Sequence, residues 1–324
     1  MGTLQNCLHA DHIQSALSGS AAAQSALIAS WRRSMRLYGL NPEEGTSPNV
    51  LTDRELQEAR ERLGSLIHTA QTSLDRLYSA VGGAGCCVLL ADKDGVPVDR
   101  RGSASDDEVF YRMGLWTGAV WSEESEGTNG IGTALAEQRA LTIHRDQHFL
   151  SRNTALSCTV APIFDHRGRL MAAIDVSSAR WDLTEDFVKL IAVAVVDAAR
   201  RVEAENFRLA FPKARIVLAQ GVGDPISDRT MHALIAVDED DLVIGASRAA
   251  RRLLGLNDEA MSKPLPAANL LGQHADAERE LAAAERSVIQ RVLASAGGNI
   301  SLAAAMMGIG RATLHRKLKK LGIH

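Results

Sequence analysis

Residues 298–323 read GNISLAAAMMGIGRATLHRKLKKLGI, and this stretch decides the fold of the C-terminal part of the chain. Asn299 can cap a short helix, because its side-chain oxygen can accept from unpaired first-turn N–H groups. The inner face of that helix would carry Leu302, Ala303 and Met306. Residues 308–310 (GIG) follow as a tight turn, and a second helix over 311–321 would bury Leu314, Leu318 and Leu321. Two short helices joined by a three-residue turn with glycine predict a helix-turn-helix.

The charge of this region is strongly biased. No Asp or Glu occurs from residue 286 to the end, although the whole chain has a formal net charge of −3. Seven cations lie there: Arg286, Arg291, Arg311, Arg316, Lys317, Lys319 and Lys320. Concentrated positive charge attracts the phosphate backbone of nucleic acids through the release of counterions. A solvated helix face is the plainer interpretation, but the coincidence of turn, small residues and charge favours DNA binding.

The stretch 298–323 closely resembles the Fis-type helix-turn-helix. The resemblance implies that Arg311 and His315 face base edges in the major groove. It places Thr313, Arg316 and Lys320 toward phosphates, and Lys317 completes the expected DNA-binding set. Fis-type modules are dimeric, so helix 278–296 would supply the dimer contact through Leu281, Ala284, Val288 and Val292.

Composition bounds what the rest of the chain can be. The 324 residues predict two or three domains at about 100–200 residues each. Hydrophobic residues make up 46% and charged residues 23%, which is typical of a globular protein. The four cysteines form no CxxC pair, so neither a disulfide framework nor a structural zinc site is expected. No signal peptide and no apolar stretch of about 20 residues is found, so we expect a cytoplasmic protein without a membrane span.

Helices are expected at several places. Residues 1–23 look frayed, a helix over 24–39 carries Trp31 and Met35 on one face, and Thr52 or Asp53 can cap a helix that reaches Val81. Heptad-spaced apolar residues mark this last helix: Leu56, Leu63, Ala70 and Leu77. A long helix over 184–210 has a similar stripe: Val188, Ile191, Val195, Ala198, Val202 and Leu209. Each stripe suits a seam between two helices, and packing of the helix on its own domain is the alternative.

Between these helices the apolar period changes from helical to extended. Residues 86–91 (CCVLLA) precede a hairpin turn, DKDG at 92–95, and residues 157–164 and 169–177 flank a second turn. Residues 140–144 form a further candidate strand. With a glycine-rich helical and loop region over 106–137, the pattern predicts an antiparallel sheet with helical insertions.

Three segments, 31–40 (WRRSMRLYGL), 127–135 (GTNGIGTAL) and 142–178, resemble acetoin-catabolism-type activators. These are bacterial enhancer-binding regulators whose N-terminal half contains a GAF sensor domain, and the resemblance covers about 24–210. Residues 230–256 are similar to a shortened PAS-like segment. The family carries a AAA+ ATPase with a phosphate-binding glycine–lysine loop. The present sequence has no Gly-Lys dipeptide, so no ATPase activity is expected.

The predicted fold class is α+β, in four parts. Residues 1–50 form an N-terminal helical cap, 51–210 a GAF-like sensor with flanking helices, 211–272 a shortened PAS-like segment and linker, and 273–324 the Fis-type helix-turn-helix. Within the third part, a short hairpin is expected over 232–246 and a linker over 257–277.

The candidate ligand-binding residues of the sensor are Cys87, Trp116, Trp121, Asn129 and Thr133. Adjacent strand residues point to opposite faces, so one of Cys86 and Cys87 can face a pocket. The two tryptophans can stack on a ligand or pack in the core. Asn129 and Thr133 can hydrogen-bond a small polar molecule, whereas the glycines around them suit a tight structural loop.

We expect no metal, no other cofactor and no catalytic residue. His144, His148 and Cys158 are weak metal-ligand candidates, because geometry at a strand end is not that of a helix face. Buried inert thiols are the default for the cysteines.

Taken together, the patterns predict a ligand-responsive, DNA-binding transcriptional regulator that is not an enzyme. Its expected partners are double-stranded DNA, a small-molecule effector and a second copy of the chain, with RNA polymerase as a further candidate. The alternative is a signalling adaptor whose GAF region binds a partner protein and whose Fis-like tail only dimerises. Arg311, Arg316 and Lys320 favour DNA, because a dimer seam would not collect like charges.

Overall fold

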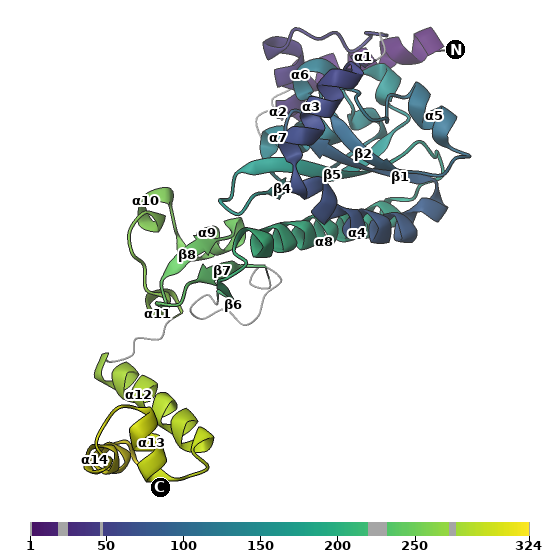
Figure 1. Cartoon of the computed structure of the whole chain (residues 1–324). Helices are drawn as coiled ribbons and strands as arrows, with labels where there is room; N and C mark the ends of the chain where they lie inside the picture. Colours follow the sequence, from purple (N-terminus) through teal and green to yellow (C-terminus); the bar gives the residue numbers. More distant parts are fainter. Residues whose placement is uncertain (1, 19–24, 46–47, 220–231, 272–276, 324) are drawn as a thin grey trace. The chain divides into compact units, whose positions relative to one another are not determined.

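The structure is a computed structural model that describes residues 2–18, 25–45, 48–219, 232–271 and 277–323 (Figure 1). The chain divides into two compact units, Met1–Lys263 and Pro264–His324. Each unit is described by itself. The predicted α+β class is confirmed, and the four-part division of the chain stays a prediction.

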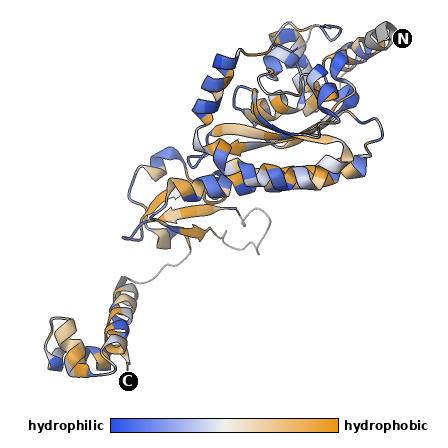
Figure 2. Cartoon of the chain, turned by 45° about the vertical axis from the view of Figure 1, so that its right-hand side comes forward, coloured by the Kyte–Doolittle hydropathy of each residue, from blue (hydrophilic) through white to orange (hydrophobic). Residues whose placement is uncertain are grey.

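The first unit is built on a five-stranded antiparallel sheet with strand order β2-β1-β5-β4-β3. The strands are β1 (Cys86–Asp92), β2 (Pro97–Arg101), β3 (Leu141–His144), β4 (Ser157–Phe164) and β5 (Leu170–Ser178). All residues of β1 and β4 are buried, and Figure 2 shows the strands as strongly hydrophobic elements. The predicted strands and both turns are therefore confirmed to within about a residue.

Helices cover both faces of this sheet. The long helices α4 (Ser65–Val81) and α8 (Glu185–Ala210) pack side by side on one face. The other face, here called the inner face, is covered by short helices and loops: α5 (Asp107–Arg112), α6 (Glu123–Glu126) and α7 (Gly130–Glu137). Cys86 packs with α4 and α8 whereas Cys87 lies on the inner face, as the alternation of strand side chains predicts. Three single-turn 3-10 helices lie nearby: η3 (Gly82–Ala84), η4 (Arg145–Gln147) and η5 (Ser151–Asn153).

The expected single helix over 52–81 is two helices. Thr52 caps α3 (Asp53–Leu63) in a reciprocal capping box with Glu55. Gly64 then adopts a φ of +53°, a left-handed value that interrupts the helix before α4 starts.

The apolar stripes of these helices pack inside the chain. Leu63, Ala70 and Leu77 share one buried cluster with the α8 residues Ile191, Val195, Ala198 and Val202. Leu209 is instead exposed. Most residues of both stripes therefore fill the core between α4, α8 and the sheet, as the alternative interpretation holds.

The N-terminal region is more ordered than the sequence suggested. Residues Gly2–Ser18 form helix α1, so the expectation of a frayed segment is wrong there, and residues 19–23 lie outside the described part. The predicted helix over 24–39 is present as α2 (Ala26–Arg32), followed by the π-helix η2 (Arg33–Leu37). Trp31 of α2 is buried with Ile13 of α1, so packing between the two helices explains the order of α1.

A three-stranded antiparallel sheet follows α8. Its strands are β6 (Arg215–Leu218), β7 (Leu234–Val237) and β8 (Val243–Ala246), with β7 in the middle, and α9 (Arg248–Leu254) follows. The predicted hairpin corresponds to β7 and β8, and β6 was not predicted. Phe207 near the end of α8 packs with Leu234 and Ala236 of β7.

The expected linker over 257–277 contains two short helices, α10 (Asp258–Met261) and α11 (Ala267–Leu270). Asn257 caps α10, because its side-chain oxygen accepts from the Ala260 N–H at 2.8 Å. The linker expectation is wrong for these residues, and 272–276 lie outside the described part.

The second unit contains α12 (Ala277–Ser295), α13 (Ile300–Met306) and α14 (Arg311–Leu321). Its core is formed by Ile289, Ala296, Ala303, Ala304, Leu314 and Leu318. The predicted inner face of α13 is partly wrong: Leu302 and Met306 are 50% and 55% exposed. Ile300, Ala303, Ala304 and Met307 face the core instead, which is the i, i+3, i+4, i+7 stripe of a helix.

Candidate functional site

The C-terminal unit presents one strongly basic helix, α14. Leu314 and Leu318 anchor it in the core, so its other faces point away from the domain. The exposed residues include four of the predicted DNA-binding positions, Arg311, His315, Arg316 and Lys320, and Thr313 is half-buried. Because α14 contains no acidic residue, no carboxylate of this helix offsets its cations.

Lys317 differs from the other predicted positions. It is half-buried, and its ammonium forms an ion pair with Glu285 of α12. Lys317 therefore fixes α14 against α12, and its contact with DNA stays a prediction.

The inner face of the five-stranded sheet brings together charged, hydroxyl and thiol residues of four strands. Asp175 of β5 lies opposite Leu89 of β1, which lies opposite Arg100 of β2 on its other side. In the next row, Ser177 lies between Cys87 and Cys158. Charged and thiol side chains thus share a surface that is otherwise apolar.

Asp175 is fully buried at the centre of this surface. The Ser177 hydroxyl donates to its Oδ2 at 2.6 Å, whereas its Oδ1 has no hydrogen-bond partner among the described residues. Burial raises the pKa of Asp175 to about 7, because desolvation disfavours the charged carboxylate. An unpaired buried oxygen of this kind is costly unless a ligand or water satisfies it.

Arg100 is the cation of the same surface. Its Nη1 lies 2.7 Å from the Asp107 carboxylate, and its guanidinium carbon lies 4.2 Å from the centre of the Trp116 ring. Its Nε and Nη2 are buried and find no hydrogen-bond acceptor in the described parts of the chain. Arg100 and Asp175 act on the pKa of Cys87 in opposite directions, so both charges lie near that thiol.

The inner face therefore brings two of the predicted ligand residues, Cys87 and Trp116, near two residues that sequence reasoning missed, Arg100 and Asp175. Trp121 packs in the apolar core of the same face. Asp175 had a readable signal, since a carboxylate inside the apolar run of β5 is rarely buried without a partner. No sequence pattern pointed to Arg100, because β2 is partly exposed and has the residue pattern of an ordinary edge strand.

The other three predicted ligand residues have partners inside the protein. The Trp121 indole is buried and donates to the Gly114 carbonyl at 2.7 Å. Asn129 caps α7 by accepting from the Gly132 N–H at 2.8 Å. Thr133 lies 3.2 Å from the Glu123 carboxylate. These contacts explain the residues structurally, and a role for them in ligand binding stays a prediction.

The glycines around Asn129 permit close packing. A Cβ on Gly130 would lie 2.5 Å from the Cβ of Cys158, and one on Gly132 would lie 2.4 Å from the Glu123 nitrogen. These separations are too short for any larger residue, so close packing at the start of α7 requires glycine at both positions.

The N-terminal helices are tied to the cover of the inner face by a half-buried arginine and the carboxylates that it pairs with. Arg33 donates to both oxygens of Glu123, at 2.8 and 2.9 Å, and to Glu137 at 3.1 Å. Ser30 also hydrogen-bonds Glu123, whose side chain is nearly inaccessible to solvent. Two-pronged pairing of this kind is strong and geometrically specific, so the N-terminal segment is an integral part of the sensor.

The candidate metal ligands do not converge. Among the described residues, no three His, Cys, Asp or Glu side chains are grouped as a metal site. His148 is buried, with its Nδ1 3.0 Å from the Arg145 carbonyl, and burial lowers its pKa to about 4. Burial also raises the pKa of the Cys86, Cys87 and Cys158 thiols, which disfavours the reactive thiolate form.

Comparison with known protein families supports both regions independently. The sequence model of the GAF domain matches residues 65–202, and that of bacterial regulatory proteins of the Fis family matches residues 280–321. The chain combines a GAF domain with a Fis-type helix-turn-helix. The GAF match contains the five-stranded sheet with α4 and most of α8, and the Fis-type match contains most of α12 and all of α13 and α14.

Relatives of this chain are bacterial regulators. The acetoin catabolism regulatory protein of Cupriavidus necator is 36% identical over 78% of this chain and 37% of its own length. The acetoin dehydrogenase operon transcriptional activator of Bacillus subtilis is 29% identical over 58% of this chain and 31% of its own length. The present chain thus spans about a third of the length of these relatives. They are named as regulators, which supports the expectation that the chain is not an enzyme.

A solved structure has a fold similar to that of much of this chain. A chain in the crystal structure of the E. coli DhaR(N)–DhaL complex matches 73% of this chain and 79% of its own length, with a TM-score of 0.53 and 18% sequence identity. In the described part of the present chain, no helix combines the length and the apolar character that crossing a bilayer requires.

Proposed function

We propose that this chain is a transcriptional regulator that binds double-stranded DNA through α14 and responds to a small effector at the inner face of its GAF domain. The observation that carries the proposal is the union of a GAF domain and a Fis-type module in one chain. The basic outward surface of α14 supports DNA binding, since Arg311 and His315 lie one turn apart and Arg316 and Lys320 form a second such pair.

The unpaired atoms on the inner face indicate what the effector must carry. Arg100 offers two buried N–H groups, and Asp175 offers one buried oxygen. A small polar molecule with both an acceptor and a donor would satisfy them. A cleft of about 590 Å³ opens at the edge of this face, where Phe110 and Ala179 belong to both the cleft and the inner core. We assign the effector entrance to this cleft.

The DNA-binding proposal is tested with two single substitutions. Arg311→Ala should cost about 1–3 kcal/mol at a site selected from random-sequence DNA by the wild-type protein, and should relax specificity, because a contact to a base edge is lost. Lys320→Ala should weaken binding to all DNA similarly and reduce the slope of log affinity against log salt by about 1. Fluorescence anisotropy at several salt concentrations measures both effects.

Arg54→Ala is the matched control, because it removes an arginine that is highly exposed on α3 of the other unit. It should leave DNA affinity unchanged. Equal affinities for the wild type and both α14 variants would contradict the proposal. A dimeric wild-type protein that binds no DNA at low salt would favour the adaptor alternative instead.

We further propose that the functional form is a homodimer joined through α12. Leu281, Ala284 and Val288 recur on one side of this helix and are exposed, with Leu281 72% and Val288 42% accessible. Val292, the fourth residue of the predicted contact, packs against the core of its own module. The contact is therefore narrower than the sequence suggested.

A further inference from the structure

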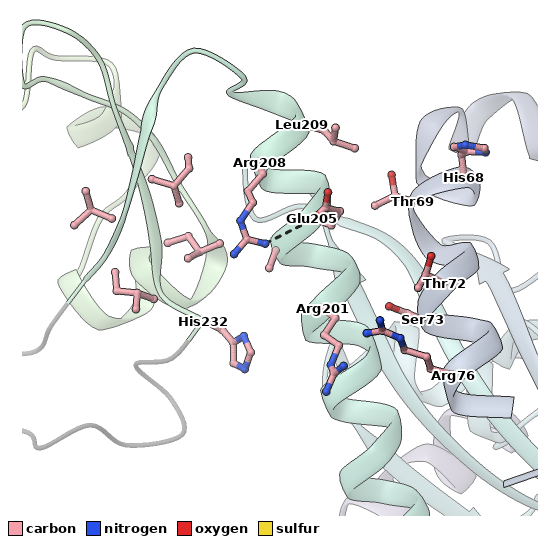
Figure 3. A pocket seen from close by; sticks show the side chains of 15 residues that line it. His68, Thr69, Thr72, Ser73, Arg76, Arg201, Glu205, Arg208, Leu209 and His232 are labelled. Atoms are coloured by element: carbon pink, nitrogen blue, oxygen red, sulfur yellow. Dashed lines mark ion pairs between the residues drawn. The ribbon is translucent and has the colours of Figure 1, made fainter. Parts of the chain in front are cut away.

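A second cleft lies on the opposite side of the GAF sheet from the inner face. It is bounded by α4, α8 and the strands β6 and β7, and its volume is about 920 Å³ (Figure 3). Pockets of roughly 300–1,000 Å³ are typical of small-molecule sites. All of its lining residues belong to the first compact unit.

The walls of this cleft differ in chemistry. The α4 wall is polar, with the hydroxyl groups of Thr69, Thr72 and Ser73 and the cation of Arg76. The wall formed by the small sheet is apolar, with Ile216 and Leu234 among its side chains. A molecule held between the walls would therefore need one polar and one apolar part.

Two cations converge at the polar end. Figure 3 shows the guanidinium groups of Arg76 and Arg201 pointing into the same gap between α4 and α8. Both residues, with Ser73, also line the adjoining groove along the two helices. Like charges placed together repel each other, and an anion bound between them removes that repulsion.

The charges of the cleft nearly balance. Arg201 is paired with Asp197 at 2.7 Å, and Arg208 lies 3.6 Å from Glu205. Arg76 has neither an ion pair nor a hydrogen bond with any residue that the structure describes. One positive charge is left over, which matches a singly charged ligand better than a dianion such as phosphate.

We propose that this cleft binds an organic monoanion, a carboxylate with an apolar body. The carboxylate lies between Arg76 and Arg201 beside the Ser73 hydroxyl, and the apolar body lies against β6 and β7. The site is separate from the proposed effector site, because the sheet and its two long helices lie between them.

Occupation of the cleft would tie the small sheet to the sensor. The small sheet already packs on Phe207 of α8, and Arg248 of α9 lies over the Phe164 ring at the end of β4. A ligand bridging α4 and β7 adds a third contact at the point where the chain leaves the GAF domain. Binding there would favour one orientation of the small sheet on that domain.

The test uses octanoate as the probe and the full chain as the protein. Equilibrium dialysis should show saturable binding of one octanoate per chain. Arg76→Ala should weaken binding by about tenfold or more, because a charge-assisted hydrogen bond is lost. Arg76→Lys should retain part of the affinity, since it keeps the charge but not the fork of donors.

Arg54→Ala serves again as the control and should bind octanoate like the wild type. The exposed position of Arg76 predicts an unchanged melting temperature, so loss of binding would not reflect unfolding. The proposal is overturned if the wild type does not bind octanoate, or if Arg76→Ala binds it equally well. It is also overturned if 1-octanol, or inorganic phosphate, competes as strongly as octanoate itself.

Discussion

At the scale of single residues, Asp175 is the most informative position in the sensor. A fully buried carboxyl group with one unpaired oxygen destabilises the fold. Proteins keep such groups where binding or switching needs them. The ordinary pKa of an aspartate is 3.8, and burial raises that of Asp175 to about 7. The folded protein therefore holds a proton there across a range in which the unfolded chain has lost it.

This shift predicts the direction of a pH effect. Because the folded state binds the proton more tightly, Asp175 makes the free energy of unfolding fall as pH rises from about 4 to 7. Asp175→Asn keeps an acceptor for Ser177 and removes the ionisation. The variant should be more stable than the wild type at pH 8, on the order of a few kcal/mol, and the difference should shrink toward pH 4. Melting temperatures of both proteins across this range check it; a gap that widened toward acid would contradict the assignment.

The residues of the site were only partly predictable from the sequence. The exposure of the α14 cations could be predicted, because a helix that buries three leucines on one side directs its charged residues to the solvent. The partners of Trp121 and Asn129 could not be predicted. The sequence does not show whether an indole or an amide hydrogen-bonds a ligand or the backbone. Arg100 is held on the inner face by its contacts with Trp116 and Asp107. Such contacts follow only from the three-dimensional arrangement.

At the scale of elements, α8 shows how one pattern fits two structures. A stripe of apolar residues at three- and four-residue spacing suits a helix pair between two chains and a helix packed on a sheet equally well. The structure places this stripe against α4 and the five-stranded sheet. Other apolar residues of α8, such as Leu190 and Val193, face outward.

Two substitutions two residues apart test this orientation of α8. Val195 is fully buried and Val193 is 70% exposed. Val195→Glu should destabilise the GAF domain by about 3 kcal/mol or more, because it buries an unpaired charge. Val193→Glu should change stability by less than about 0.5 kcal/mol. Thermal melting followed by circular dichroism separates them, and similar losses for both variants would show that α8 is rotated differently.

The elements themselves were predicted with uneven success. Apolar runs bounded by DKDG and DHRG turns located β1, β4 and β5 well. The break at Gly64 was missed, because a single glycine inside a helical pattern is often tolerated. Strand β6 was missed because four residues, RIVL, are too few to show alternation.

At the scale of the whole molecule, the chain joins a GAF domain at residues 65–202 to a Fis-type module at residues 280–321. The described residues between α8 and α12 form the small sheet and three short helices, α9 to α11. In the proposed function, a signal from the GAF domain reaches α14 through this sheet or through the proposed dimer. That requirement makes the oligomeric state part of the proposed function.

The dimer contact on α12 can be tested without disturbing the fold. Val288→Glu places a charge on the proposed contact, where it would be desolvated in the dimer. It should raise the dimer dissociation constant at least tenfold, or about 1.4 kcal/mol. Gln290→Glu adds the same charge at an exposed position two residues away and should leave dimerisation unchanged. Sedimentation velocity at micromolar concentrations measures both, and an unaffected Val288→Glu dimer would place the contact elsewhere.

The buried pairing of Arg33 with Glu123 limits how this sensor can be exchanged between proteins. The two residues lie 90 positions apart, and the carboxylate of Glu123 is almost completely enclosed. A gene fusion that joined a new partner at residue 51 would remove Arg33 and Ser30. The buried carboxylate of Glu123 would then lack both of these hydrogen-bond donors. Recombination can therefore move this GAF domain as a working module only when the junction lies upstream of α2.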